Sequence, residues 1–301
     1  MTSSRALSFG AFSTLLLIAL MMGANHVAAR VAFNHGVDVA TAVVFRSVVT
    51  ASVVTALVVL QGVRVAFTPR HRKFLLLIGL LVGVQSLFLY SAVARLPVAL
   101  ALLAFNTYPL WTALWAALIY RKPPERSVLM AMPVILIGLA LALDVFGAAS
   151  GLGAAGQWSR IGVGVGFALM AAATFGAALV FTQHEAADID GRVRTATTLG
   201  LAGLVGLASV GVQGGFHLPQ VAAGWWGLAA LTVLYGTAFT IMFTVLPRLG
   251  VVGNSAIMNV EPVFALILAW LILGQAIAPV QIAGALLVVG AVMVLGLRRR
   301  T

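Results

Sequence analysis

The chain has 301 residues, of which 62% are hydrophobic and only 8% are charged, and its formal net charge at pH 7 is +11. A soluble domain carries about a quarter charged residues, so this composition excludes a water-exposed surface over most of the chain. The apolar runs are long and do not alternate as the strands of a lipid-embedded barrel do. We therefore predict an all-α integral membrane protein, whose helices satisfy their own backbone groups in lipid.

Ten transmembrane helices are predicted from the apolar runs, at residues 7–29, 38–61, 73–94, 97–120, 127–145, 160–182, 194–213, 222–246, 250–273 and 278–297. The first run is uncharged from Ala6 to Ala29, which is longer than a cleavable signal sequence and enough to span a bilayer. It is therefore expected to be a retained helix. The two longest links, Phe146–Ser159 and Gln183–Val193, are interpreted as plain connectors.

Basic residues beside the spans predict the orientation, because Lys and Arg favour cytoplasmic loops. With both termini inside the cell, 14 of the 18 Lys and Arg residues lie on the inside. Arg46 lies within a span, and the three basic residues on the outside are Arg30, Arg95 and Arg160. Membrane topology thus accounts for the positive charge. We expect no nucleic-acid binding, because no basic patch is large enough to follow a phosphate backbone.

The sequence repeats itself at an offset of 153 residues. The clearest match is Asn-x-x-Pro, at Asn106–Pro109 in the fourth span and at Asn259–Pro262 in the ninth. Each copy holds five spans, an odd number, so the second copy is predicted to cross the membrane upside down. The basic loop Arg121–Arg126 accordingly has an uncharged counterpart, Gly274–Pro279. The prediction is N-in/C-in, with two inverted five-helix repeats around a central cavity, at residues 1–150 and 151–301.

Polar groups at mid-depth in a membrane are costly and usually face a cavity or a partner. Glu261 lies halfway along the ninth span beside Pro262, and the fourth span carries Asn106 and Pro109 at matching positions. Each proline removes a backbone donor and bends its helix, so both helices are predicted to break where substrate binds. A plain kink is the alternative for the prolines, and interhelical hydrogen bonds are the alternative for Asn106 and Asn259.

Glu261 and Arg46 are charged residues that lie well inside their spans, away from the ends. Glu261 could bind a proton or a substrate ammonium, or it could be a structural carboxylate paired with Arg46. Arg46 could equally counter a substrate carboxylate. Lipid contact or packing is the alternative for aromatic candidates, and a hydrated helix end is the alternative for the two in the first span. The remaining candidates for substrate binding or gating are Asn25, His26, Gln85, Tyr90, Asn106, Tyr108, Trp111, Tyr235 and Asn259.

These motifs resemble the drug/metabolite transporter superfamily, in its ten-helix EamA-like branch, over essentially the whole chain. The likeness rests on Met22–Arg30, on Phe45-Arg46, on the Ala92–Pro97 junction, and on the paired Pro109 and Pro262. Within that branch the sequence looks like the YddG-type amino-acid exporters. The resemblance implies two antiparallel five-helix repeats, a central cavity lined by the first four helices of each, and export of aromatic and other amino acids. Unlike the small multidrug exporters, the first helix here has no carboxylate.

The residues and the resemblance together predict a secondary transporter that exports amino acids by alternating access. It is expected in a bacterial cytoplasmic (inner) membrane, as a monomer in contact with lipid. Export of another small metabolite or a drug is the alternative. An intramembrane enzyme is a remote one, since neither His-Glu-x-x-His nor Gly-x-Ser-x-Gly occurs, and a structural protein would not need two interrupted polar helices. No catalytic residue, metal or cofactor is expected, and the residues leave proton antiport and facilitated diffusion open.

Overall fold

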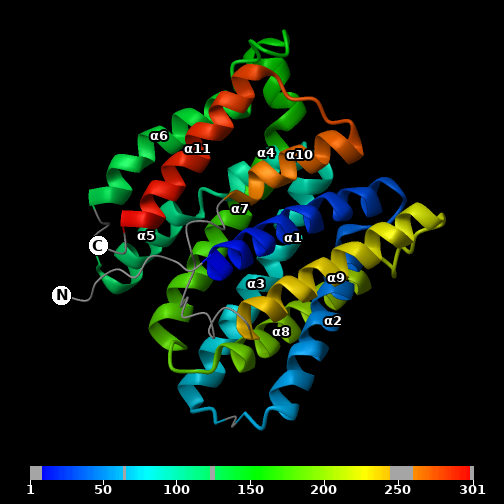
Figure 1. The fold of residues 1–301 in the computed structure, drawn as a ribbon, viewed down its shortest axis with the longest axis vertical. Helices are drawn as coiled ribbons and strands as arrows, with labels where there is room; N and C mark the ends of the chain where they lie inside the picture. Colours follow the sequence, from blue (N-terminus) through cyan, green and yellow to red (C-terminus); the bar gives the residue numbers. More distant parts are fainter. Residues whose placement is uncertain (1–8, 64–65, 123–125, 245–259, 299–301) are drawn as a thin grey trace.

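The computed structural model describes residues 9–63, 66–122, 126–244 and 260–298. Within these residues eleven helices pack into one bundle (Figure 1). The helices are α1 (Phe9–Asn34), α2 (Val39–Leu60), α3 (Pro69–Arg95), α4 (Val98–Phe105), α5 (Tyr108–Tyr120), α6 (Arg126–Ala142), α7 (Gly153–Glu185), α8 (Gly191–Val212), α9 (Ala222–Thr244), α10 (Glu261–Leu273) and α11 (Pro279–Arg298).

Seven helical stretches of the described chain are long and apolar enough to cross a membrane, and one of them combines α4 with α5. Three further apolar stretches are shorter, at Leu129–Ala142, Glu261–Leu273 and Pro279–Val294. Every predicted span overlaps one of these ten stretches. The prediction of an all-helical protein with several membrane spans is confirmed, while crossing by all ten stays a prediction.

Side-chain caps fix where several helices begin. The carboxylate of Asp38 accepts a hydrogen bond from the backbone N–H of Thr41 at 2.8 Å, and α2 begins between them. The hydroxyl of Thr68 does the same for His71, with Pro69 as the first helical residue. Such caps satisfy N–H groups that have no partner within the helix, and proline needs none at this position. The cap at Thr68 explains why α3 begins earlier than the predicted residue 73.

The predicted connector Phe146–Ser159 is wrong in its second half, because α7 already begins at Gly153. Alanine favours helix more than any other residue, and Ala154 and Ala155 form the first turn. Gln157 then fastens this turn to the end of α6, since its side-chain Nε2 donates to the carbonyl of Leu143 at 2.9 Å. The helical α7 therefore runs for 33 residues.

Helices from the two halves of the chain pack in pairs. α3 lies against α7, α1 against α9, α2 against α8, and α6 against α11, and Figure 1 shows the last pair together at one edge of the bundle. A shift of 153 residues carries α1 onto α7, α3 onto α9 and α5 onto α10. The contact of α1 with α9 then becomes that of α7 with α3, and α1 with α10 becomes α7 with α5. Both are present, so the packing repeats as the sequence does.

Two glycines at matching positions allow close approaches between helices. A Cβ on Gly23 of α1 would lie 3.0 Å from the carbonyl oxygen of Glu261 and 3.1 Å from the backbone N of Ala265 in α10. A Cβ on Gly176 of α7 would lie 2.8 Å from the backbone N of Thr112 in α5. Small residues let membrane helices approach closely, so these glycines fix how α10 and α5 sit on their partners.

Gly176→Ala is expected to destabilise the protein by about 1–3 kcal/mol, because the new methyl group meets backbone that cannot rotate away. The measurement is the thermal unfolding midpoint in detergent. Gly166→Ala, on the same helix, is the matched control: nothing lies within 4 Å of a Cβ there, and alanine is the better helix former by roughly 0.5–1 kcal/mol. Equal melting of the two variants would contradict the close approach.

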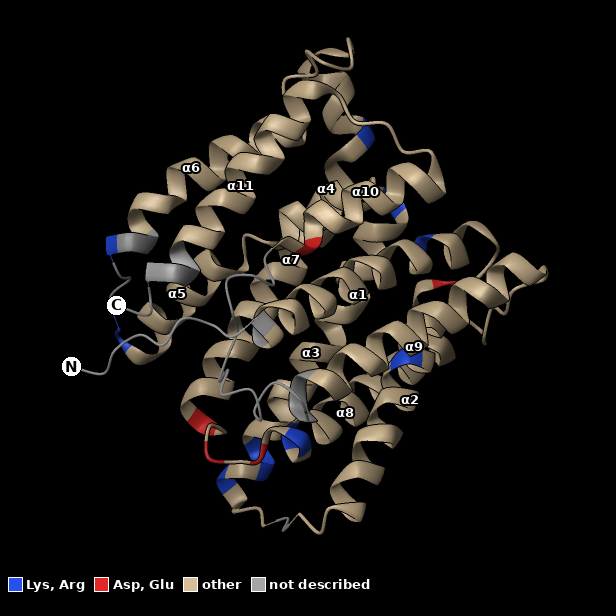
Figure 2. Cartoon of the chain, in the orientation of Figure 1, with Lys and Arg blue, Asp and Glu red and all other residues tan. Residues whose placement is uncertain are grey.

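The charges of the bundle are unevenly placed. Figure 2 shows Lys and Arg gathered at the end where α2 connects to α3 and α7 connects to α8. This end is the face predicted to be cytoplasmic.

Candidate functional site

Arg46 of α2 lies in a buried polar cluster inside the bundle. The residue is 3% exposed, and its Nη2 donates a hydrogen bond to the Ser86 hydroxyl at 2.7 Å. The guanidinium lies between two aromatic rings, with its Cζ 4.3 Å from the ring centroid of Tyr90 and 4.2 Å from that of Tyr235. Aromatic faces attract cations, so α3 and α9 hold the arginine from two sides.

This buried cation has no carboxylate beside it within the part of the chain that the structure describes. The Nε of Arg46 is buried without a hydrogen-bond partner, and so are the hydroxyl oxygens of Ser47 and Thr50 on the same helix. A buried charge without a counter-ion is costly, and each unsatisfied buried polar atom costs about 1–3 kcal/mol. The cluster is therefore chemically suited to receive an anionic group.

A second chain of contacts extends the cluster to α1 and α10. The Tyr90 hydroxyl donates to Oδ1 of Asn25 at 3.0 Å, while Nδ2 of Asn25 is buried without a partner. The ring of His26 meets the Tyr90 ring edge-on, with centroids 5.7 Å apart. Its Nε2 lies 3.3 Å from Oε1 of Glu261, the first residue of α10. Tyr90 thus stands between a cationic part at Arg46 and an acidic part at Glu261.

The fourth predicted span is interrupted in the middle of the bundle. α4 ends at Phe105, Asn106 and Thr107 follow, and α5 begins at Tyr108 with Pro109 in its first turn. Pro109 has no N–H to give to the carbonyl four residues back, which is why the helix does not continue. Nδ2 of Asn106 is buried here without a hydrogen-bond partner.

Aromatic side chains surround this break. The Tyr108 ring lies 5.6 Å from the Phe105 ring and 5.2 Å from the Phe175 ring of α7, centroid to centroid. Trp111, one turn further along α5, packs against Gly176. The surroundings of the break are therefore mostly apolar, in contrast to those of Arg46.

A family model describes this sequence twice. The model of the EamA-like transporter family matches residues 9–143 and again residues 162–297. The two matches begin 153 residues apart, the offset at which the sequence and the helix packing both repeat. The chain belongs to the EamA-like transporter family. It is accordingly a multi-pass membrane transporter of small substrates, in a family whose members are transporters and not enzymes.

A solved structure titled "Crystal structure of protein" has a similar fold, with a TM-score of 0.61. It shares 20% sequence identity with this EamA-like chain, and the match covers 98% of this chain and 100% of that one. At this identity the likeness concerns the fold alone. No curated protein matches the chain.

The two EamA copies differ sharply at the positions of the cluster. Position 46 holds arginine in the first copy, and its equivalent in the second copy is Leu199. Leu199 packs beside Val82 and Phe239. Under the 153-residue offset, Val82 is equivalent to Tyr235, and Phe239 is equivalent to Ser86. The two copies therefore place a polar and an apolar cluster in related surroundings, with Tyr235 in contact with both.

The structure brings most of the candidate residues into two groups. The polar cluster takes Asn25, His26, Arg46, Gln85, Tyr90, Tyr235 and Glu261. The helix break takes Asn106, Tyr108, Pro109 and Trp111. Pro262 lies in the first turn of α10, and Asn259 lies outside the described residues. The direct pairing of Arg46 with Glu261 is not formed within the described chain, since Glu261 contacts His26 instead.

Sequence reasoning missed three hydroxyls of the cluster, Ser47, Thr50 and Ser86. A helical signal exists for Thr50 alone, because the fourth position beyond Arg46 lies on the same face of α2. The many other Ser and Thr residues of these helices give similar signals, so this one could not be singled out. No group of three His, Cys, Asp or Glu residues that could hold a metal is found among the described residues.

Glu185 corrects the interpretation of Gln183–Val193 as a plain connector. It is the last residue of α7 and 7% exposed. Its Oε2 accepts a hydrogen bond from Nε of Arg70 at 2.7 Å, and its Oε1 accepts one from the Tyr120 hydroxyl at 2.6 Å. One carboxylate thus ties α3, α5 and α7 together at the end of the bundle that carries most of the basic residues.

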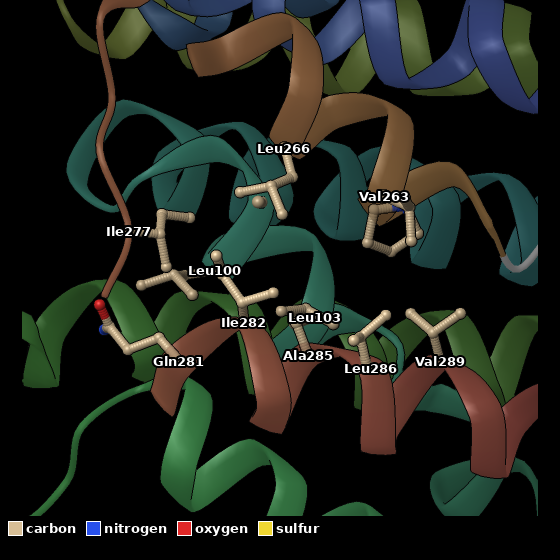
Figure 3. Close-up of a pocket in the computed structure, with 12 residues that line it drawn as sticks. Leu100, Leu103, Val263, Leu266, Ile277, Gln281, Ile282, Ala285, Leu286 and Val289 are labelled. Atoms are coloured by element: carbon tan, nitrogen blue, oxygen red, sulfur yellow. The ribbon is translucent and has the colours of Figure 1, made fainter. Parts of the chain in front are cut away.

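A small apolar pocket lies on another side of α10. It has a volume of about 120 Å³ and is walled by α4, α10 and α11. Figure 3 shows Leu100, Val263 and Ile282 lining it, with Gln281 at one end. Its lining offers no charged group, so it is not a site for a zwitterion.

Proposed function

We propose that this EamA-like chain is a secondary transporter that exports amino acids across a bacterial cytoplasmic membrane, with the cluster around Arg46 as its substrate site. One observation carries the proposal: Arg46 is buried in the bundle, held between two tyrosine rings, and has no carboxylate partner among the described residues. A substrate carboxylate would supply the missing negative charge, and Nε of Arg46 offers it a donor.

The composition of the cluster also suits the rest of an amino acid. The side chain of Glu261 is 24% exposed. Its negative charge lies on the far side of Tyr90 from Arg46, where it would attract an ammonium group. The apolar cluster around Leu199 and Phe239 meets the polar one at Tyr235. A molecule with a charged head and an apolar side chain, such as an aromatic amino acid, fits this arrangement of surfaces.

The transport mechanism that we propose is alternating access between two inverted five-helix repeats. Two observations support it: the family model matches the chain twice, and the helix contacts of α1 and α7 exchange under the same offset. Rocking one copy against the other would move Arg46 of α2 and Glu261 of α10 relative to each other. A monomer is sufficient for this motion, because both copies are in one chain.

The experiment is uptake of a panel of labelled amino acids into proteoliposomes that contain the purified chain. Saturable transport of aromatic and other apolar amino acids is expected. Transport of a different small metabolite or drug, with no response to any amino acid, would select the alternative substrate class. Glu261→Gln tests the cluster and Asn106→Ala tests the helix break. Unchanged transport by Glu261→Gln would reject our assignment of the substrate site.

A further inference from the structure

The three arginines that the orientation places outside the cell line a single cavity. Arg30 at the end of α1, Arg95 at the end of α3 and Arg160 near the start of α7 surround a volume of about 420 Å³. Arginine is rare on the outer side of membrane proteins. The convergence of all three on one cavity therefore indicates that they share a ligand.

Two of these arginines are held in place by the protein. Nη1 of Arg30 donates to the carbonyl oxygens of Val93 and Leu96, at 2.6 and 3.2 Å. The guanidinium of Arg95 lies over the ring of Phe167, with its Cζ 4.8 Å from the centroid. Anchored arginines lose less freedom when they bind, and the planar guanidinium matches a phosphate group well.

The charge of the cavity is positive. Asp144 is the one acidic residue among its described lining, and its carboxylate accepts hydrogen bonds from the backbone N–H groups of Ala149 and Ser150 at 3.0 and 2.8 Å. Desolvation works to raise the pKa of Asp144, but these backbone hydrogen bonds outweigh it and hold the pKa below its ordinary value. Among the described residues, no ion pair joins an acid to Arg30, Arg95 or Arg160.

The basic cavity continues into the apolar pocket of Figure 3. Leu100, Ile277 and Gln281 line both spaces. Beyond them, the apolar pocket runs between α4, α10 and α11 and is bordered by Ile282 and Leu286, which are 38% and 60% exposed. In a membrane helix such exposed apolar side chains face lipid. The two spaces together have the form of a polar head and an apolar tail.

We propose that this combined site binds an anionic phospholipid, with its phosphate among Arg30, Arg95 and Arg160 and an acyl chain in the pocket between α4, α10 and α11. The charge complementarity selects the headgroup, and the apolar pocket selects a lipid over a soluble anion. The site is separate from the cluster around Arg46 and does not depend on which substrate the protein transports. Because α10 borders it, a bound lipid would stabilise the helix that contributes Glu261 to the substrate site.

The test is native mass spectrometry of the purified full chain with equal amounts of phosphatidylglycerol and phosphatidylcholine of identical acyl chains. The wild type is expected to retain phosphatidylglycerol preferentially. The double variant Arg95→Gln/Arg160→Gln is expected to lower that preference by about fivefold for each arginine removed, since one basic residue contributes roughly 1 kcal/mol of attraction to an anionic lipid. The matched control is Arg72→Gln/Lys73→Gln, two exposed basic residues at the opposite end of the bundle.

The contribution of the tail is tested with Ala285→Trp, which fills the apolar pocket and leaves the arginines in place. It is expected to weaken lipid retention while the protein still elutes as a folded species. Glycerol phosphate, the soluble headgroup, is expected to compete poorly. The proposal would be overturned if the double arginine variant preferred phosphatidylglycerol as strongly as the wild type does. It would also be overturned, in favour of a soluble anion, if glycerol phosphate competed as well as phosphatidylglycerol.

Discussion

Arg46→Gln is expected to raise the KM for a transported amino acid by about 10- to 100-fold. A hydrogen bond to a charged group contributes about 1.5–3 kcal/mol, and each 1.4 kcal/mol is a factor of about ten in affinity. Glutamine is similar in polarity but carries no charge, so it removes the attraction to a substrate carboxylate. The measurement is the concentration dependence of uptake into proteoliposomes. The amide of the same amino acid, which lacks the carboxylate, should be transported poorly by the wild type and no worse by the variant.

A structural role for Arg46 predicts something different. If the arginine only supported the bundle, Arg46→Gln would lower the unfolding temperature along with transport, and the amino acid and its amide would be affected alike. In the proposed role, transport of the amino acid falls far more than transport of its amide, because only the amino acid carries the carboxylate that Arg46 attracts. Arg46→Lys keeps the charge but not the planar donor pair, and should recover part of the affinity.

The helical spans could be predicted from the sequence because each is a continuous apolar run, and lipid leaves the backbone few other options. The residues at which the helices begin were harder to predict from the sequence. The start of α3 at Pro69 depends on the hydroxyl of Thr68, and the start of α7 at Gly153 depends on Gln157 reaching the carbonyl of Leu143. Both are local contacts whose existence the apolar pattern does not report.

Which residues belong to the site could largely be predicted, since polar side chains inside spans are few. Which of these residues contact one another could not be predicted. The sequence suggested Arg46 and Glu261 as a pair because both are charged and lie well inside spans. The rotation of each helix decides the outcome instead: α2 turns Arg46 toward Ser86 and Tyr90, and α10 turns Glu261 toward His26. That rotation is set by close packing between helices, such as that at Gly23. The residue pattern of a single helix does not reveal such contacts.

The repeat carried more information than any single residue. It predicted that two copies of one unit form the bundle, and the family model matches the chain twice at that offset. It did not show that the copies divide the chemistry. Arg46 and Leu199 are equivalent positions with opposite character, so the pseudo-equivalent surroundings have diverged to provide charge in one copy and apolar surface in the other. An asymmetric substrate with a charged head needs that divergence.

Glu261→Gln is expected to abolish the response of transport to a pH gradient. His26 and Glu261 join α1 to α10 across 3.3 Å, and a proton on the carboxylate weakens their attraction, which would allow the two helices to separate. An amide cannot change its charge. If one proton is exchanged for each substrate, the wild type should accumulate substrate about tenfold per pH unit, since one unit corresponds to about 1.4 kcal/mol. The variant should only equalise concentrations. The measurement is a pH jump on loaded proteoliposomes.

Asp188→Asn provides the matched control for that experiment. Asp188 lies 3.2 Å from His71 in a pair of the same chemical kind, but its side chain is 70% exposed and lies outside the bundle core. A solvated pair of this sort contributes little, so the control should respond to pH as the wild type does. A wild type that ignores the gradient would exclude proton coupling altogether. A Glu261→Gln variant that still follows the gradient would place the coupling proton elsewhere and leave Glu261 with the substrate ammonium alone.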